Sequence, residues 1–534
     1  MLSYCELSVS GFKLSEQELD NALSAINHHG YSAMLPEPVE WAEVKNNWKD
    51  IRDNIKEIDL DNYEPYKPMK IFAPKSRANI RVVHLLHPQD LIIYTALTLI
   101  VKDDIEQERL SKQTRRVFSF RVDTRKADRL YDSRGGYSLF TDQLNKKAEK
   151  ATIKYVGVAD IADFYPRIYQ HRLENVIQTL DRNSRSNNVA RVLVKKFISK
   201  LMGLNSYGIP VGPYASRILA EAVLIDVDSF LSLNKIDFVR WVDDFHIFCK
   251  SEYEAQANLF NLGEWLYSNH GLTLQSAKTR IYPISRYKKI IAETPEENLS
   301  KRDAAVALLQ KVDTDYKDEG QEKQELDEDE IIAITEKLQA VDLLSMLKES
   351  ISDKSLVDYK IVKYVLTKLP LVPGLLDELK HEILDLIIDN AGLLYPVSEE
   401  IAKYILSFAD ITKSEKKQIG KKLLKPLTSK HSPPPDYYIM WILYIFSTSE
   451  DWNHIKDIIK IYKNSNSEVT KRYAALAVAK GGSRNEALII KDDIGSASAL
   501  LKLAILEATK NLGTDERKHW KRTYTFSGIL EKKI

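Results

Sequence analysis

Hydrophobic and polar positions follow two different patterns along the 534 residues. Between about residues 69 and 282, short runs rich in Val, Ile, Phe and Trp alternate with helical segments, which predicts strands separated by helices. After about residue 330, stretches with helical periodicity alternate with Pro and Gly breaks, which predicts helices alone. We therefore expect an α+β domain followed by an all-α domain.

The predicted boundaries follow these changes of pattern. The parts are an N-terminal helical segment (1–65), an α+β domain (66–300), an acidic linker or helix start (301–330) and an all-α domain (331–534). Within the last part, residues 469–479 and 500–512 resemble the paired helices of a HEAT-type solenoid.

Two of the predicted strands end in carboxylates. Asp243 and Asp244 stand between two apolar runs, so we expect them at the tip of a tight hairpin, and Asp160 ends a third run. Like charges this close raise each other's pKa, which favours a bound divalent cation. Two such sites on one sheet suit two-metal nucleotidyl transfer, with ions roughly 4 Å apart. Two other Asp-Asp pairs, 103–104 and 492–493, lie in polar, helix-like surroundings and are interpreted as solvated surface.

Three further stretches have both a functional and an ordinary structural interpretation. Lys75 and Arg81 on a predicted hairpin suit a triphosphate, or protect an edge strand from aggregation. The Gly- and Pro-rich loop 205–216, which leads into a helix predicted to reach about residue 231, either lets a base pair approach the backbone or simply begins that helix. Residues 271–281 predict a turn, a strand and a cationic end.

Composition and charge narrow the function classes. The content of 44% hydrophobic and 29% charged residues is ordinary for a globular protein, and the net charge of +1 does not indicate a nucleic-acid binder. Residues 66–200, however, hold 27 Lys and Arg against 14 Asp and Glu, which suits either a polyanion channel or solvated helix faces. Two distant cysteines exclude a disulfide framework, and the longest apolar run is too short to span a bilayer, so we expect a cytoplasmic protein without a membrane contact.

Taken together, residues 70–282 resemble the fingers and palm of a reverse transcriptase, with six motifs in the family's order. The resemblance implies metal ligands at Asp160, Asp243 and Asp244, nucleotide contacts at Lys75 and Arg81, and an aromatic side chain at Tyr165 that blocks a ribose 2′-hydroxyl. It also implies a loop facing nucleotide and template, with Gly208, Pro210, Val211 and Gly212, and a lysine, Lys278, that protonates the leaving pyrophosphate.

Some positions depart from the usual pattern. Trp241 replaces the tyrosine before the metal pair, Val211 replaces the glutamine of template-directed enzymes, and no thumb motif follows Tyr282. With residues 216–221 and the helical C-terminal part, these features resemble the bacterial abortive-infection reverse transcriptases of the AbiK and AbiA type and their relatives in P-two-type prophages. That resemblance implies phage defence, a trimer or hexamer, and template-independent synthesis of single-stranded DNA from dNTPs, primed by a hydroxyl of the protein itself.

The mechanism that we expect uses two Mg²⁺ ions, with Mn²⁺ as a substitute. Asp160 and Asp243 hold them, with support from Asp244 and the Ile161 carbonyl. Tyr4, Tyr31 and Tyr63 are candidate priming residues among 27 tyrosines. Two other hypotheses stay open: a template-directed reverse transcriptase with a dedicated RNA, and a catalytically silent scaffold whose helical domain binds a protein.

Overall fold

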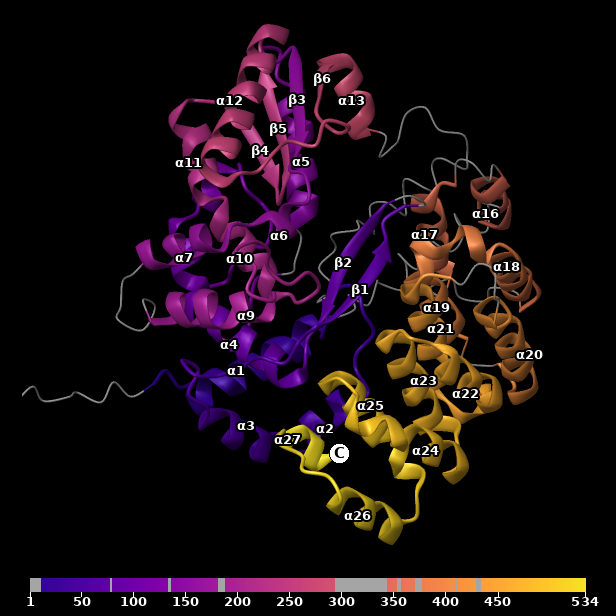
Figure 1. Cartoon of the computed structure of the whole chain (residues 1–534). Coiled ribbons are helices and arrows are strands. Elements are labelled where there is room, and N and C mark those ends of the chain that lie inside the picture. Colours follow the sequence, from indigo (N-terminus) through magenta and orange to yellow (C-terminus); the bar gives the residue numbers. More distant parts are fainter. Residues whose placement is uncertain are drawn as a thin grey trace, which may run out of the picture.

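The computed structural model describes residues 11–76, 79–132, 136–180, 188–292, 343–352, 357–369, 377–408, 411–428 and 434–534. The predicted acidic linker 301–330 and the priming candidate Tyr4 lie outside these residues. Figure 1 shows a mixed part that contains a sheet and a separate, entirely helical part, with a two-stranded hairpin between them.

The described N-terminal residues form three helices, α1 (Glu16–His29), α2 (Trp41–Asn46) and α3 (Trp48–Lys56). Ser15 caps α1: its hydroxyl accepts from the Glu18 amide while the Glu18 carboxylate accepts from the Ser15 amide, as the sequence predicts. Helix α1 packs on α4 (Pro88–Glu108), which is buried along most of its length.

The mixed part is built on a four-stranded antiparallel sheet in the order β4-β5-β3-β6. Its strands are β3 (Tyr155–Asp160), β4 (Phe238–Trp241), β5 (Asp244–Cys249) and β6 (Arg280–Pro283). Helix α12 (Glu252–His270) covers one face, where a Cβ at Gly157 would lie 3.1 Å from the Leu259 side chain. Helices α5 (Gly136–Ala148) and α13 (Ile284–Ala292) pack against each other and the other face, so both faces of the sheet are covered.

Shorter helices surround the sheet and differ from the prediction in two places. They are α6 (Phe164–Arg167), α7 (Gln170–Thr179), the π-helix η2 (Arg191–Ile198), α9 (Ser199–Leu201), α10 (Ala215–Val223) and α11 (Ile225–Leu233). The single helix predicted up to about residue 231 is wrong: Leu224 leaves helical geometry at ψ 3° and separates α10 from α11. The strand predicted within 271–281 also lies later, since Leu274 makes only an isolated bridge to Ile161.

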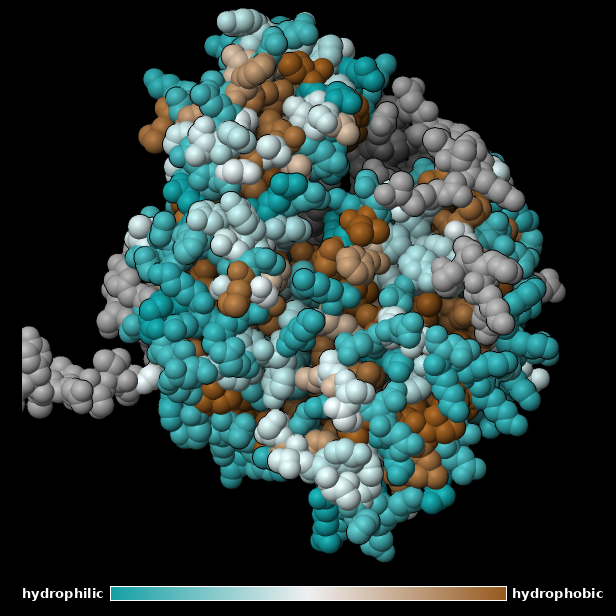
Figure 2. Space-filling model, in the orientation of Figure 1, coloured by the Kyte–Doolittle hydropathy of each residue, from teal (hydrophilic) through white to brown (hydrophobic). Residues whose placement is uncertain are grey.

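A second sheet has two strands, β1 (Met69–Pro74) and β2 (Ile80–Leu85), as the sequence predicts. The hairpin packs on helices α21 (Asp436–Thr448) and α23 (Glu468–Gly481) of the helical part. Phe72 and Ile80 are 49% and 61% exposed, and Figure 2 shows hydrophobic residues near the middle of this face, where the hairpin lies.

Every described residue after 343 that has regular structure is helical. Helices α17 (Tyr359–Lys368), α19 (Ser398–Leu406), α21, α23 and α25 (Ala499–Ala508) form a row in which each packs on the next. Other helices flank this row, namely α16 (Leu343–Ser352), α18 (Asp377–Asp389), α20 (Lys413–Leu424), α22 (Ile455–Asn464) and α24 (Arg484–Lys491). The chain closes with α26 (Thr514–Arg522) and α27 (Ile529–Lys533).

The helical part is joined to the N-terminal helices by a buried ion pair. Arg472 of α23 lies 2.5 Å from Glu40, and both side chains are fully buried. Lys510 adds a more exposed contact to Glu43 at 2.8 Å. A buried pair penalises any arrangement that separates its charges, so this contact fixes how the two parts sit together. Among the described helices, none is both long and apolar enough to cross a membrane.

Candidate active site

The turn between β4 and β5 presents the paired aspartates. Trp241 pairs with Asp244, which leaves Val242 and Asp243 as the two turn residues and confirms the predicted hairpin. Val242 has a φ of 52°, a left-handed conformation that costs a β-branched residue roughly 1–2 kcal/mol. Its amide donates to the Ser119 hydroxyl at 3.0 Å and its carbonyl accepts from Arg240 at 2.7 Å. These two bonds hold the turn in its strained form.

Beneath the turn lies a set of buried side chains, four charged and one hydroxyl, that we call the Glu221 cluster. Its members are Arg109, Ser119, Glu221, Asp228 and Arg240. Arg240 contacts Asp228 at 2.5 Å and Glu221 at 3.0 Å, and Arg109 contacts Glu221 at 2.7 Å. Although burial opposes ionisation, Arg240 and Arg109 lower the pKa of Glu221 below its usual value. Each buried charge therefore has an opposite partner, which such a site requires.

The three predicted metal ligands meet at one end of the sheet. Asp160, the last residue of β3, lies directly opposite Asp244, the first residue of β5. The Ile161 amide donates to the Asp243 carbonyl at 3.2 Å, so the end of β3 is tied to the turn. The Gln275 amide donates to the Asp160 carbonyl at 2.7 Å and brings the segment before Lys278 to the same place. The predicted meeting of two strand-end carboxylate sites on one sheet is confirmed.

Negative charge accumulates at this sheet end. Burial first, and then the neighbouring Asp160 and Asp244, raise the pKa of Asp243 to about 7. Burial also raises the pKa of Asp160, while Lys278 and Lys75 oppose that rise. The Lys278 ammonium donates to Asp160 Oδ2 at 3.1 Å. At neutral pH the carboxylates are thus only partly compensated by cations of the protein, and additional positive charge would be bound favourably.

A histidine and a tyrosine beside Asp244 escaped the sequence analysis. His246 Nε2 lies 3.3 Å from Asp244 Oδ2, and His246 Nδ1 lies 2.7 Å from the Tyr287 hydroxyl. Because side chains alternate along a strand, a residue two positions after Asp244 shares its face, and this period could have pointed to His246. Tyr287 comes from α13, and no local pattern connects it with the aspartates.

The donor set fits magnesium. In the described part of the chain, no group of three or more His, Cys, Asp or Glu side chains is arranged to hold a metal ion by itself. Mg²⁺ commonly binds one or two carboxylates and completes its octahedron with water and substrate phosphates, so a ready-made cage is not required. Asp160 and Asp243 offer hard oxygen donors, and a divalent cation would relieve the charge that raises the Asp243 pKa. The Ile161 carbonyl stays a predicted ligand.

Lys75 and Arg81 lie on the same hairpin but in different surroundings. Lys75 is exposed in the turn after β1, close enough to Asp160 that its charge acts on the Asp160 pKa. Arg81, opposite Ala73 in the register, donates to Met34 Sδ at 3.5 Å. The structure therefore brings Lys75 toward the carboxylates and directs Arg81 to the N-terminal segment.

The predicted loop of Gly208, Pro210, Val211 and Gly212 is fixed between α6 and β2. The Ile209 amide donates to the Tyr165 carbonyl at 3.2 Å, and the Val211 amide donates to His84 Nδ1 at 3.1 Å. Gly212 has a φ of 118°, and a Cβ there would lie 3.0 Å from the Ser32 hydroxyl, so a larger residue would disturb the loop.

Tyr165 is half-buried beside Arg217. The Arg217 guanidinium lies over Tyr214 at 4.6 Å and Phe120 at 4.9 Å, and it donates to the Tyr131 hydroxyl at 2.8 Å. Aromatic rings thus surround this guanidinium and help to compensate its burial. The arrangement places Tyr165 next to a firmly held cation at the start of the loop.

Comparisons with known proteins agree with this geometry. Residues 74–302, less than half of the chain, match the family described as Reverse transcriptase (RNA-dependent DNA polymerase). No curated protein matches the chain. The chain is similar at low level to apo telomerase from Candida tropicalis truncated from its C-terminal domain, with 14% identity and a TM-score of 0.30 over 44% of this chain and 51% of that one. It thus spans about half of that protein's length.

A telomerase from Candida albicans in complex with the TWJ fragment of telomeric RNA is 13% identical with a TM-score of 0.31, covering 77% of this chain and 71% of that chain. The family match is the stronger finding, because it includes the described strands β2 to β6 and all three aspartates. Residues 74–302 are therefore a reverse transcriptase domain, and this domain indicates a nucleotidyltransferase.

Proposed function

We propose that this enzyme adds dNTPs to a hydroxyl by two-metal nucleotidyl transfer at Asp160, Asp243 and Asp244. The observation that carries the proposal is the register that sets Asp160 opposite Asp244 with Asp243 in the adjoining turn. When bound, two Mg²⁺ ions would activate the attacking hydroxyl and stabilise the leaving pyrophosphate.

The residues of the chain supply position and charge. Asp160 and Asp243 would hold the metal ions, and Asp244, fixed next to His246, would support them. Lys75 would compensate the charge of the triphosphate, and Lys278 stands beside Asp160, from where its ammonium can donate a proton to the leaving group. Gly208, Pro210, Val211 and Gly212 would contact nucleotide or template, and Tyr165 would exclude a ribose 2′-hydroxyl. For Arg81 to reach a nucleotide, its side chain would have to leave Met34.

More specifically, we propose that the protein is an abortive-infection enzyme that synthesises DNA without a template and uses its own polypeptide as the primer. It is supported by Val211, whose apolar side chain stands where templated enzymes carry a glutamine, and by helices α21 and α23, which pack on the β1–β2 hairpin. The row α17, α19, α21, α23 and α25 supports a HEAT-like solenoid. A trimer or hexamer and a covalently attached single-stranded DNA product belong to the same proposal.

Burial argues against two of the three candidate priming residues. Tyr31 is 4% exposed and donates to the Leu86 carbonyl at 2.6 Å, and burial raises its pKa well above the usual value. The Tyr63 hydroxyl donates to Asp90 at 2.7 Å, and burial raises its pKa as well. Neither hydroxyl is presented for attack, so both candidates are disfavoured and Tyr4 stays a prediction.

A second candidate function is template-directed synthesis on a dedicated RNA. The observation that favours it is the excess of cations between residues 66 and 200, 27 against 14 acidic residues. Such a stretch would bind a template duplex through its phosphates.

One incubation separates the two functions. Purified protein is mixed with Mg²⁺ and one labelled dNTP at a time, without nucleic acid, and run on a denaturing protein gel. Label on the polypeptide that is lost on treatment with DNase supports untemplated, protein-primed synthesis. Label that needs an added RNA template and primer supports the second function. The variant Asp243→Asn should stay unlabelled in either case.

A further inference from the structure

A cavity of about 680 Å³ lies at the C-terminal end of the chain. Figure 1 shows α26 and α27 at the opposite end of the molecule from strands β3 to β6. Nine residues line it: Lys510, Leu512, Thr514, Arg517, Lys518, Lys521, Arg522, Phe526 and Lys532. Six of these are Lys or Arg and none is acidic, in a protein whose net charge is only +1. The charge here is concentrated and of one sign.

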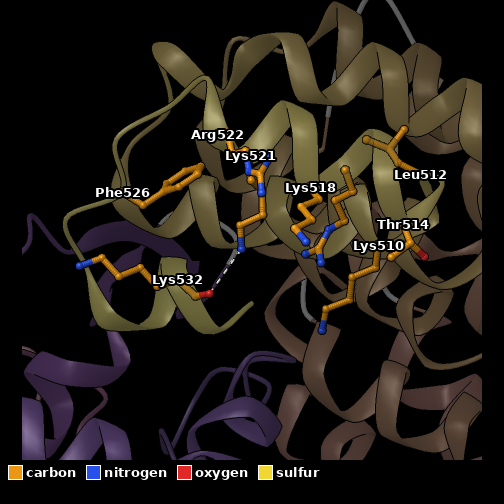
Figure 3. Close-up of a pocket in the computed structure, with 9 residues that line it drawn as sticks. Lys510, Leu512, Thr514, Lys518, Lys521, Arg522, Phe526 and Lys532 are labelled. Atoms are coloured by element: carbon orange, nitrogen blue, oxygen red, sulfur yellow. Dashed lines mark hydrogen bonds between the residues drawn. The ribbon is translucent and has the colours of Figure 1, made fainter.

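Three of the six cations have partners within the protein. Lys510 lies 2.8 Å from Glu43 and 2.9 Å from Glu507. Arg517 donates to backbone carbonyls, including that of Ile534. Lys521 donates to the Glu531 carbonyl at 3.3 Å and to the Lys532 carbonyl at 3.5 Å, and Figure 3 shows this last bond at the rim of the cavity. These bonds orient the side chains, but the carbonyls of Glu531 and Lys532 do not cancel the charge of Lys521.

The other three cations, Lys518, Arg522 and Lys532, are exposed, and among the described residues no acidic side chain pairs with them. Burial, together with the nearby charges of Arg517 and Lys510, lowers the pKa of Lys521. Like charges held this close repel one another, and an anion with several charges would relieve the repulsion.

The shape and chemistry of the cavity suit a nucleic-acid strand more than a single phosphate. The volume lies in the range of sites for nucleotide-sized ligands. Phe526 adds an aromatic ring at the lining, with the Lys521 ammonium 5.8 Å from its centre, so a base can stack where phosphates meet cations. Single-strand binding sites combine these two elements.

We propose that this cavity binds the phosphate backbone of single-stranded DNA, away from the carboxylates that would synthesise it. The identity of the strand as the enzyme's own product rests on the proposed function. Lys518, Arg522 and Lys532 contact phosphates, Phe526 stacks on a base, and Arg517 and Lys521 supply fixed positive charge. The site thereby holds part of the growing strand on the helical part of the same protein.

The test measures binding of a fluorescein-labelled 20-nucleotide oligo(dT) to full-length protein by anisotropy, from 50 to 300 mM salt. The change is Lys518→Glu with Arg522→Glu. The matched control is Lys456→Glu with Lys460→Glu, two exposed lysines of α22 with the same change in net charge. We expect the Kd of the cavity variant to be at least tenfold higher than that of the unmodified protein. The slope of log K against log salt should be smaller in magnitude by about 1.4, since each of the two lost phosphate contacts removes about 0.7. The control should stay within twofold of the unmodified protein.

A second measurement uses the unmodified protein, so it does not depend on a variant's folding. Lysines are acetylated with and without the oligonucleotide and mapped by peptide mass spectrometry. Lys518 and Lys532 should be protected, while Lys456 and Lys460 should react equally in both samples.

Equal oligonucleotide binding by the cavity and control variants would overturn the proposal. Displacement of the strand by dATP at the same phosphate concentration would overturn it as well, because the site would then be one for free nucleotides. The oligonucleotide is supplied ready-made, so these results do not depend on polymerisation: binding without dNTP incorporation would refute the proposed function alone, and incorporation without binding would refute the cavity alone.

Discussion

Arginine and lysine have opposite surroundings in two regions of this molecule. In the Glu221 cluster, Arg109 and Arg240 are buried and each contacts a carboxylate within 2.7 Å. Around the C-terminal cavity, cations such as Lys518 and Arg522 face solvent, and no acidic side chain in the described part of the chain pairs with them. Charges that are neutralised inside the protein can hold the turn of Val242 and Asp243 but bind nothing else. Charges left without partners contribute little to the fold and are available to a ligand.

The largest effect on stability should come from breaking the buried cluster. Glu221→Ala leaves two buried guanidinium groups without their shared partner, and such a loss costs about 3–5 kcal/mol. Thermal or denaturant unfolding measures the change. The matched control is Glu516→Ala, which removes an exposed pair with Arg484 at 2.8 Å and should lower stability far less, because solvent screens exposed charges. Equal losses for both variants would show that burial does not distinguish the two regions.

The second prediction concerns Asp243, whose pKa in the folded protein is about 7 because of burial and two acidic neighbours. A carboxyl with a raised pKa lowers stability as pH rises, because the folded state must ionise it at a penalty while the unfolded state ionises near pH 4. In EDTA at pH 8, the free energy of unfolding of Asp243→Asn should therefore be higher than that of the unmodified protein by on the order of 1–4 kcal/mol, and its Tm should be higher as well.

Since that penalty develops between about pH 4 and the folded pKa of about 7, the advantage of Asp243→Asn should shrink at pH 5 and vanish below about pH 4. A difference in Tm that is the same at pH 5 and pH 8 would contradict the raised pKa. Asp493→Asn is a suitable control, because Lys471 and Tyr462 lower the pKa of Asp493 although burial opposes them.

The third prediction, with a smaller expected effect, concerns the proposed role of Tyr165 in selecting dNTPs over ribonucleotides. Tyr165→Ala should admit ribonucleotides, lowering the preference for dNTPs by about 10- to 100-fold, the range of a pocket that loses one steric contact. Single-nucleotide incorporation with dATP and ATP measures the ratio. Tyr169→Ala, an exposed tyrosine in the same segment, should leave the preference unchanged. If Tyr165→Ala also leaves it unchanged, another residue excludes the ribose hydroxyl.

The two regions also differ in how much the sequence could predict. The carboxylates stand at strand ends, and short strands with period-2 alternation are a local signal, so the hairpin and the meeting of Asp160 with Asp244 followed from the residues. The Glu221 cluster beneath them could not be predicted from the sequence. Ser119 and Arg109 lie more than 100 residues before Glu221 and Arg240 in the chain, and only the tertiary fold brings them together.

The cavity was missed for the same reason. Its cations stand on three separate segments: Arg517, Lys518, Lys521 and Arg522 lie on α26, and Lys510 and Lys532 come from the segments on either side of it. The break at Leu224 was missed because no Gly or Pro between residues 215 and 233 marks it. A local pattern thus predicted most of the strands and the aspartates at their ends, while the groups that neutralise or concentrate charge required the fold.

The central claim is that the sheet-end aspartates catalyse nucleotidyl transfer. The most direct measurement is incorporation of labelled dNTPs by the unmodified protein and by Asp243→Asn, each with Mg²⁺, first without nucleic acid and then with an RNA template and DNA primer. The account predicts activity in at least one condition for the unmodified protein and a loss of at least 1,000-fold for the variant, which keeps its fold. Incorporation by Asp243→Asn at a comparable rate would contradict the account.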